Sequence, residues 1–191
     1  TPEQVKVLNM LNTKYYLYQG NLVLQNPHAY GNAWFVNSIE YVDNADEEIL
    51  TVGKIDPKNT AVVDNLFSDI IPSASYQNDS QAKIELTSYL PNKLSYTTKA
   101  EADQLAIFSE VYYKDGWNAY IDGKVVDHFR ANYILRGLHI PKGNHNVEFR
   151  FEPKMFDIGN IIGLVTFLTI CVVLVYSIVM EVKLKRQQLS D

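Results

Sequence analysis

The chain has 191 residues and a net charge of −5, because 17 Lys and Arg stand against 22 Asp and Glu. This acidic balance argues against a nucleic-acid-binding module, which would carry a basic face, and 47% hydrophobic residues exclude a largely disordered chain. A single cysteine excludes an intramolecular disulfide framework and a cysteine-rich zinc site.

The chain begins Thr1-Pro2, with neither an initiator Met nor a signal-peptide pattern, so we expect it to be a piece of a longer protein. Its first part predicts two short helices, over residues 2–11 and 45–52. Asn44 can cap the second helix, and acidic residues occupy its first turn, where the helix dipole favours them.

The strands expected in this first part alternate with turn signals. They are residues 14–18, 22–24 (joined to the first by a Gly20-Asn21 turn), 33–42 and 60–63. A change of pattern after Pro72 predicts a boundary between a mixed α/β lobe, residues 1–72, and a second region that begins at residue 73.

From Gln81 onward only strands are expected until the C-terminal apolar segment. They are residues 82–87, 94–98, 105–113, 117–121, 124–129, 133–140 and 146–152. Asp122-Gly123 suits a type I′ hairpin turn, which needs positive φ at both central residues. Short strands at this spacing predict an antiparallel β-sandwich over residues 73–156, and hence a mainly β fold.

The segment from Ile158 to Met180 carries no formal charge and is long enough, as a helix, to cross the roughly 30 Å hydrocarbon core of a bilayer. We therefore predict one transmembrane helix over residues 157–181. The alternative is a buried helix of a soluble core. It would need a covering layer on every side, and only a mostly polar tail comes after it.

Flanking charges predict the orientation of this helix. Lys183, Lys185 and Arg186 come closely after the span, whereas only Arg150 and Lys154 precede it closely. The bias favours a cytoplasmic tail at residues 182–191 and an extracytoplasmic body.

Gly159 and Gly163 form a G-x-x-x-G pattern near the outer end of the span, and Asn160 lies between them. Small residues at this spacing allow two helices to approach closely. These three residues are candidates for helix–helix packing, while the alternative is that they are ordinary members of a membrane helix.

Catalytic motifs are missing from the sequence: there is no H-E-x-x-H, no G-x-S-x-G and no glycine-rich phosphate loop. His139 and His145 flank one predicted turn, but without a carboxylate cluster they do not predict a metal site. The acidic run at Asp43, Asp46, Glu47 and Glu48 is expected to be a solvated helix start rather than a cation site. We expect no catalytic residue, cofactor or metal in this chain.

Aromatic residues offer the best candidates for ligand contact, because a flat ring face can pack against the apolar face of a pyranose. Tyr113, Trp117 and Tyr120 are the candidate sugar contacts. Trp34 and Tyr112 belong to the same aromatic set, and the alternative for all of them is that they fill the sandwich core.

Several segments together resemble one known family. They are Tyr112-Tyr113-Lys114-Asp115-Gly116-Trp117-Asn118-Ala119-Tyr120-Ile121-Asp122-Gly123-Lys124, Arg130-Ala131-Asn132-Tyr133-Ile134-Leu135-Arg136-Gly137, Ile140-Pro141-Lys142-Gly143-Asn144-His145, Val147-Glu148-Phe149-Arg150-Phe151-Glu152-Pro153 and Leu11-Asn12-Thr13-Lys14-Tyr15. Their order and the terminal helix resemble the C-terminal part of the YfhO family of bacterial multi-pass membrane proteins. Two positions depart from the family pattern: Asp115, where Pro is frequent, and Thr13, where Val is frequent.

The resemblance implies a large N-terminal bundle of membrane helices preceding this chain. It also implies the architecture of GT-C glycosyltransferases, which use lipid-linked sugars outside the membrane, and an action on cell-envelope polymers such as lipoteichoic acid. The catalytic acids of such enzymes lie in outer loops of the preceding bundle.

Two hypotheses remain open. In the first, the chain is an accessory domain with the last membrane helix of such a glycosyltransferase, and its partners are the bilayer, the preceding helices and a glycan or lipid-linked sugar. In the second, it is a non-catalytic surface module that binds envelope glycan or a membrane partner. No nucleic-acid partner is expected in either case.

Overall fold

The computed structural model describes residues 2–19 and 22–188, so the predicted Gly20-Asn21 turn and the last residues of the predicted tail lie outside the described residues. The described chain divides into two units. The first ends at Glu152, and the second begins at Pro153. We call the first unit the body. The fold is mainly β, with 41% strand and 28% helix, as the sequence predicts.

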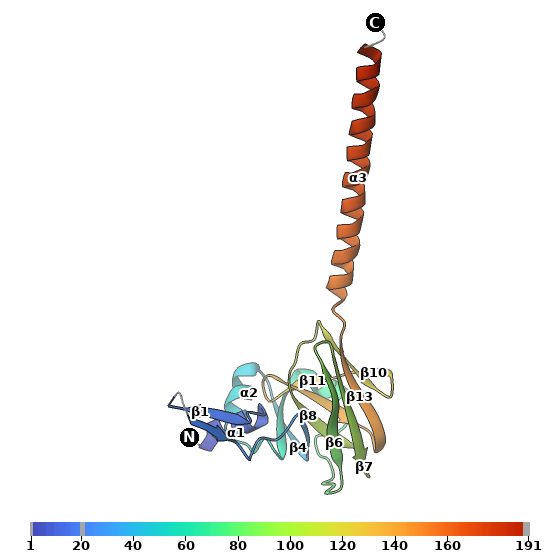
Figure 1. Ribbon diagram of the computed structural model, residues 1–191. Helices are drawn as coiled ribbons and strands as arrows, with labels where there is room; N and C mark the ends of the chain where they lie inside the picture. Colours follow the sequence, from blue (N-terminus) through green and yellow to red (C-terminus); the bar gives the residue numbers. More distant parts are fainter. Residues whose placement is uncertain (1, 20–21, 189–191) are drawn as a thin grey trace. The chain divides into compact units, whose positions relative to one another are not determined.

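The described part of the body contains short helices and the strands of four sheets, shown in chain order by the colours of Figure 1. Its elements are α1 (Pro2–Met10), β1 (Tyr15–Tyr18), β2 (Leu22–Gln25), β3 (Ala33–Val36), β4 (Ser38–Val42), α2 (Ala45–Val52), β5 (Thr60–Asp64), the 3₁₀-helix η1 (Asn65–Ile70), β6 (Lys83–Leu90), β7 (Lys93–Ala100), β8 (Gln104–Val111), β9 (Trp117–Ile121), β10 (Lys124–Val126), β11 (Phe129–Ala131), β12 (Leu135–Ile140) and β13 (Gly143–Phe151).

Two antiparallel sheets form the predicted sandwich. The five-stranded sheet has the order β10-β9-β13-β7-β6, and the four-stranded sheet has the order β11-β12-β8-β3. Alternate residues of both sheets point inward and build one core, in which the rings of Phe108 and Phe149 meet edge to face at 4.8 Å. Such aromatic pairs contribute more than their buried area alone.

The four-stranded sheet is covered on both faces. Along β8, Ala106 and Phe108 join the sandwich core, whereas Leu105 and Ile107 join a second core with residues of α2, β4 and β5. A strand buried on both faces reads as a continuous apolar run rather than an alternating one. The N-terminal elements therefore form a third layer against the outer face of this sheet.

Residues on both sides of position 72 contribute to the four-stranded sheet. Strand β3 pairs with β8, with Ala33 opposite Phe108, and the described residues up to Glu152 form one compact unit. The separate lobe at residues 1–72 and the sandwich at residues 73–156 stay predictions about domain organisation.

The single strand expected over residues 33–42 is wrong. Asn37 separates β3 from β4, and β4 leaves the sandwich to pair in parallel with β5. The backbone of Asn37 bonds elsewhere, because its N–H donates to Asn59 at 2.8 Å and its carbonyl accepts from Tyr76 at 2.7 Å. The break lets one apolar stretch serve two sheets.

The strands expected over residues 124–129 and 133–140 are also too long. β10 ends at Val126, and Phe129 begins β11 in the other sheet, where its ring lies over Gly137. A Cβ on Gly137 would clash with that ring, so the glycine makes the approach possible. Asn132 and Tyr133 have φ of 49° and 74° and form a turn, which delays β12 to Leu135.

Two local predictions are confirmed in detail. Asp122 and Gly123 have φ of 50° and 79°, as the turn between β9 and β10 requires. Asn44 caps α2, because its side-chain oxygen accepts a hydrogen bond from the Glu47 N–H at 2.9 Å.

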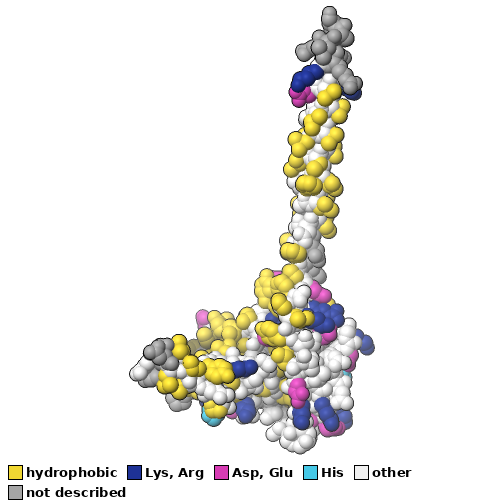
Figure 2. Space-filling view, in the orientation of Figure 1, with side chains coloured by type: hydrophobic (Ala, Val, Ile, Leu, Met, Phe, Trp, Pro, Cys, Tyr) yellow, Lys and Arg dark blue, Asp and Glu magenta, His cyan; other side chains and the backbone are white. Residues whose placement is uncertain are grey.

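The second unit is dominated by α3 (Lys154–Gln188). Its stretch Ile158–Lys183 has a mean hydropathy of 2.6 and is long and apolar enough to cross a membrane. Figure 2 shows hydrophobic side chains along the visible face of this helix. Thr166, Thr169 and Ser177 donate to carbonyls one turn earlier at 2.8–2.9 Å, so their hydroxyl groups are satisfied within the helix.

Candidate functional site

A groove runs over the body between the segment that contains η1 and the β9–β10 hairpin. It has two adjoining hollows, of about 460 and 630 Å³, which share Ile70, Val126 and Asp127. The first hollow is also lined by Leu66, Phe67, Tyr112, Lys114, Trp117, Asn118, Ala119, Val125 and His128. The second is also lined by Asp69, Pro72, Ile121, Asp122, Lys124, His139, Pro141 and His145.

Aromatic rings form one part of the first hollow. Phe67 and Tyr112 meet edge to face at 5.8 Å, and Trp117 is half-buried beside them. On its inner side, the Trp117 ring lies 4.3 Å from the guanidinium carbon of the buried Arg136. This cation–π contact holds the indole in one orientation.

Polar groups accompany these rings. Asn118, Asp127 and Lys114 bring an amide, a carboxylate and an ammonium group to the same hollow. Asn118 is fixed by a hydrogen bond to Glu152 at 2.8 Å. An aromatic surface with a few polar groups around it is the usual composition of a small-ligand site.

His128 lies at the inner edge of the first hollow. Burial, together with the charge of Arg136, lowers its pKa to about 4, so its ring is neutral at pH 7. Its Nε2 atom is buried and has no hydrogen-bond partner among the residues that the structure describes. The imidazole therefore offers an unused donor or acceptor.

The histidines of the second hollow each face a separate carboxylate. His145 Nδ1 lies 2.7 Å from Asp122, which raises the pKa of His145, whereas burial lowers the pKa of His139 despite Asp103 at 3.7 Å. Within residues 2–19 and 22–188, no three His, Cys, Asp or Glu side chains are grouped to hold a metal ion.

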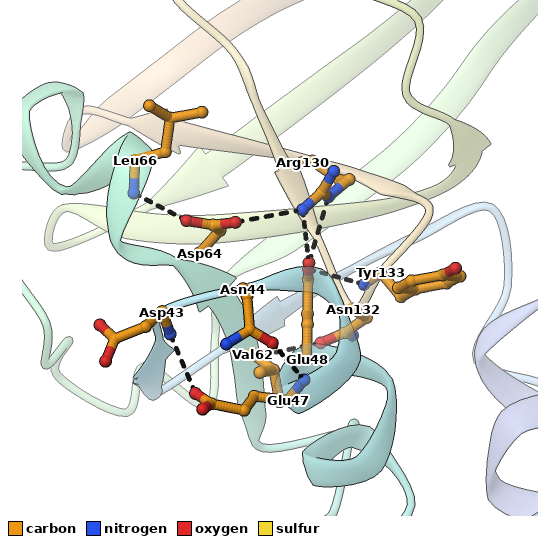
Figure 3. A network of polar contacts seen from close by, with 10 residues as sticks. All are labelled: Asp43, Asn44, Glu47, Glu48, Val62, Asp64, Leu66, Arg130, Asn132 and Tyr133. Atoms are coloured by element: carbon orange, nitrogen blue, oxygen red, sulfur yellow. Dashed lines mark hydrogen bonds and ion pairs between the residues drawn. The ribbon is translucent and has the colours of Figure 1, made fainter.

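The η1 side of the groove is held by an ion pair between the partly exposed Arg130 and the buried Glu48 (Figure 3). Arg130 donates to Glu48 at 2.8 and 3.1 Å, and also contacts Asp64 at 3.4 Å. Asp64 in turn accepts from the Leu66 N–H at 2.9 Å and so caps η1. Through Asp64, the ion pair thus holds the start of η1, which lines this side of the groove.

Glu48 corrects the prediction of a solvated acidic run. Asp43, Asp46 and Glu47 are not buried, but Glu48 is fully buried and accepts the Tyr133 N–H at 2.8 Å. Burial raises the pKa of Glu48, and the Tyr133 amide and Arg130 oppose that rise. The sequence offered no signal for this, because the partners lie more than eighty positions away.

Asn132 completes the connection between the sandwich and the N-terminal layer. Its side-chain oxygen accepts the Val62 N–H at 2.9 Å, and its own N–H donates to the Val62 carbonyl at 2.8 Å. The segment Arg130–Tyr133 therefore clamps α2 and β5 against β11.

Of the three predicted sugar contacts, only Trp117 lines the groove. Tyr113 is 52% exposed and stacks on Phe151 at 6.5 Å, outside the hollow. Tyr120 is half-buried, donates to Glu152 at 2.7 Å and lies under the guanidinium of Arg150. Sugar contact stays a prediction for all three. Trp34 lies in the core and donates to Pro57 at 2.9 Å.

The predicted helix-packing residues are exposed on α3. An added Cβ at Gly159 or Gly163 would meet no atom within 4 Å, and Asn160 is exposed beside them. Packing of another helix at these positions stays a prediction.

Comparison with known proteins finds similarity to one family. Residues 71–163 match the family model described as bacterial membrane protein YfhO. A Bacillus subtilis (strain 168) protein named "Uncharacterized protein YfhO" is 28% identical over 119 residues, which are 62% of this chain. Over these residues the chain is similar to the YfhO family. No solved structure matches it.

The YfhO match and the apolar helix α3 together support a membrane location for the chain. The match covers only 14% of the length of the Bacillus relative. The YfhO match at residues 71–163 includes Trp117, Asn118 and Asp127 but not η1, so the groove combines residues from inside and outside the matched segment.

Proposed function

We propose that this chain is the extracytoplasmic accessory domain and last membrane helix of a YfhO-like glycosyltransferase, and that its groove holds a glycan. The observation that carries the proposal is the first hollow, where the indole of Trp117 lies among Asn118, Asp127 and Lys114. A pyranose can place its apolar face on the ring and its hydroxyl groups on the amide and carboxylate.

Catalysis belongs, in this proposal, to the part of the protein that precedes the chain. A catalytic acid or base must lie within hydrogen-bond reach of the reacting group, and the groove offers positioning groups instead. Holding an acceptor in place can contribute several kcal/mol to a reaction. The role of the groove is therefore to present the acceptor polymer, or the sugar of a lipid-linked donor, to the membrane part.

The orientation in this proposal rests on charge. Lys183, Lys185 and Arg186 lie at or beyond the end of the apolar stretch and favour a cytoplasmic tail. A reporter that works only outside the cytoplasm should be active when fused after Pro153 of the full-length protein and silent when fused at the C-terminus. The reverse pattern would contradict the extracytoplasmic body.

Glycan binding can be measured on the whole chain in lipid nanodiscs. The probes are chitobiose, maltose and a glycerol-phosphate teichoic acid fragment, with binding followed by calorimetry. Asp127→Asn should weaken binding by about tenfold, the loss expected for one hydrogen bond to a charged group. Asp115→Asn is the matched control, because Asp115 is exposed and does not line the groove. Equal binding by both variants would overturn the groove as the site.

Transfer activity separates the two hypotheses. Membranes that contain the full-length protein should transfer a labelled lipid-linked sugar to envelope material, whereas the present chain should not. Asp127→Asn in the full-length protein should raise KM for the acceptor more than it lowers kcat. Glycan binding without transfer by the full-length protein would favour the non-catalytic surface module.

A further inference from the structure

One end of the body carries a group of exposed apolar side chains, which we call the end patch. It consists of Tyr89, Leu90, Val111, Tyr113 and Phe151. Leu90 and Tyr113 are 50% and 52% exposed, and Val111 is 61% exposed. Single exposed apolar residues are common on proteins, whereas a group of them indicates a surface that is covered by a partner.

Contacts among these residues and their neighbours place them at the same end of the sandwich. Phe151 stacks on Tyr113, and its N–H donates to the carbonyl of Asn92, in the turn after Leu90. Val111 is connected to Phe151 through two side chains: Arg136 donates to the Val111 carbonyl and lies over the Trp117 ring, and that ring meets Phe151 at 5.3 Å. The patch therefore joins the β6–β7 turn, the end of β8 and the end of β13. Figure 2 shows hydrophobic side chains gathered at this end of the body.

Covalent connection ties the end patch to the membrane span. Phe151 precedes Ile158, where the apolar stretch of α3 begins, by seven positions. Even a fully extended chain covers only about 3.5 Å per residue, so these two residues lie within about 25 Å of each other. The far end of the same strands begins at Lys83, about 23 Å further along β6.

We propose that the end patch lies in the headgroup region of the bilayer that α3 crosses. Tyrosine suits this region, because its ring is apolar while its hydroxyl group remains hydrated. The exposed Lys114, next to Tyr113, can reach lipid phosphate. The lipid surface is the occupant chosen here because the tether limits how far this end can lie from the start of the span, whereas the Lys83 end can lie about 23 Å further away.

In this proposal the tilt of the body relative to the membrane is restricted, because Leu90 and Tyr113, from different segments of the chain, both lie in the lipid headgroup layer. This contact between the end patch and the lipid depends neither on glycan binding nor on transfer activity. The body would meet the membrane in this way whatever the groove holds.

Site-specific fluorescence on the whole chain tests the proposal. The background is Cys171→Ser, which removes the single cysteine. One residue at a time is then replaced by cysteine and labelled with an environment-sensitive dye, and the chain is placed in phosphatidylcholine–phosphatidylglycerol nanodiscs. Leu90→Cys and Tyr113→Cys report on the patch, and Lys83→Cys and Lys99→Cys report on the opposite end of the same strand pair.

Lipids with a nitroxide on the headgroup should quench the dyes at positions 90 and 113 at least about twofold, because contact quenching requires the dye to lie in the headgroup layer. The dyes at positions 83 and 99 should be unaffected. Val111→Cys provides a further patch position if either patch variant fails to fold. Equal quenching at both ends, or quenching at neither, would overturn the proposal. In the second case lipid does not cover the patch.

Discussion

Arg130 of β11 and Arg136 of β12 are paired in register on neighbouring strands, yet their charges are stabilised in different ways. Arg130 is paired with the buried carboxylate of Glu48. Arg136 is 2% exposed, lies against the rings of Trp117 and Phe149, and donates from Nε to the Val111 carbonyl at 2.9 Å.

The two surroundings differ in how completely they satisfy the guanidinium. Nη1 of Arg136 is buried and has no hydrogen-bond partner within the described ranges. The carboxylate that acts on Arg136 is Glu110, whose pKa burial raises even though the charge of Arg136 opposes that rise. A buried cation can therefore be matched by a carboxylate or by aromatic faces, and the two solutions respond differently to substitution.

Arg130→Met should have the largest effect, because it leaves the Glu48 carboxylate buried without its cation. Breaking one side of a buried pair typically costs about 3–5 kcal/mol. Urea unfolding of the whole chain in detergent micelles, followed by tryptophan fluorescence, measures the loss. The double variant Glu48→Leu with Arg130→Met should recover much of the stability, and a loss below about 1 kcal/mol in the single variant would contradict a strong pair.

Trp117→Ala should come next, because it removes a half-buried ring and uncovers Arg136. We expect a cost of about 2–3 kcal/mol, from lost packing and the lost cation–π contact. Trp117→Phe is the control, since it keeps an aromatic face near the guanidinium and should cost less. If both variants unfold at the wild-type urea concentration, the ring does not support Arg136.

His128, whose pKa is lowered by burial and by the charge of Arg136, should make the stability of the body depend on pH. Its pKa is lowered to about 4 in the folded chain and lies near 6.5 when unfolded, so the unfolded state binds more protons between these values. The free energy of unfolding should be independent of His128 protonation above about pH 6.5. It should fall by about 2–3 kcal/mol as the pH drops toward 4. Stability of His128→Gln across this range provides the comparison, and an unchanged pH dependence in that variant would contradict the prediction.

Arg136→Met should have the smallest effect, below about 1 kcal/mol. The variant loses the hydrogen bond to Val111 and the cation–π contacts with Trp117 and Phe149. These losses are offset because methionine still packs favourably against aromatic rings and because the variant removes a buried cation with a nitrogen that has no partner among the described residues. Because the charge of Arg136 lowers the pKa of His128, that pKa should also rise in the variant. NMR titration of the imidazole measures it. A loss as large as that of Arg130→Met would show that the two arginines are equivalent.

The parts of the fold that depend on near neighbours were predictable. The Asp122-Gly123 turn, the Asn44 cap and the membrane helix each depend on a few adjacent residues. The alternation of Val147 and Phe149 with polar residues identified β13 in the same way. These signals are local, so the sequence carries them directly.

The parts that depend on distant segments were not. The split at Asn37 arises because β3 and β4 join different sheets. Glu48 looks like a surface residue of an acidic helix start until Arg130 and Tyr133 meet it from a distant part of the chain. The groove needed both η1 and β9, so the sequence identified Trp117 but not Phe67 or Asp127.

Strand β3 also protects its neighbour from unwanted association. It covers Leu105 to Phe108 of β8, and it comes from a segment that precedes the YfhO match at residues 71–163. A protein cut to those matched residues would leave the backbone N–H and C=O groups of an apolar strand open along a sheet edge. Such edges recruit strands from other molecules, so the N-terminal residues act as a built-in guard against aggregation.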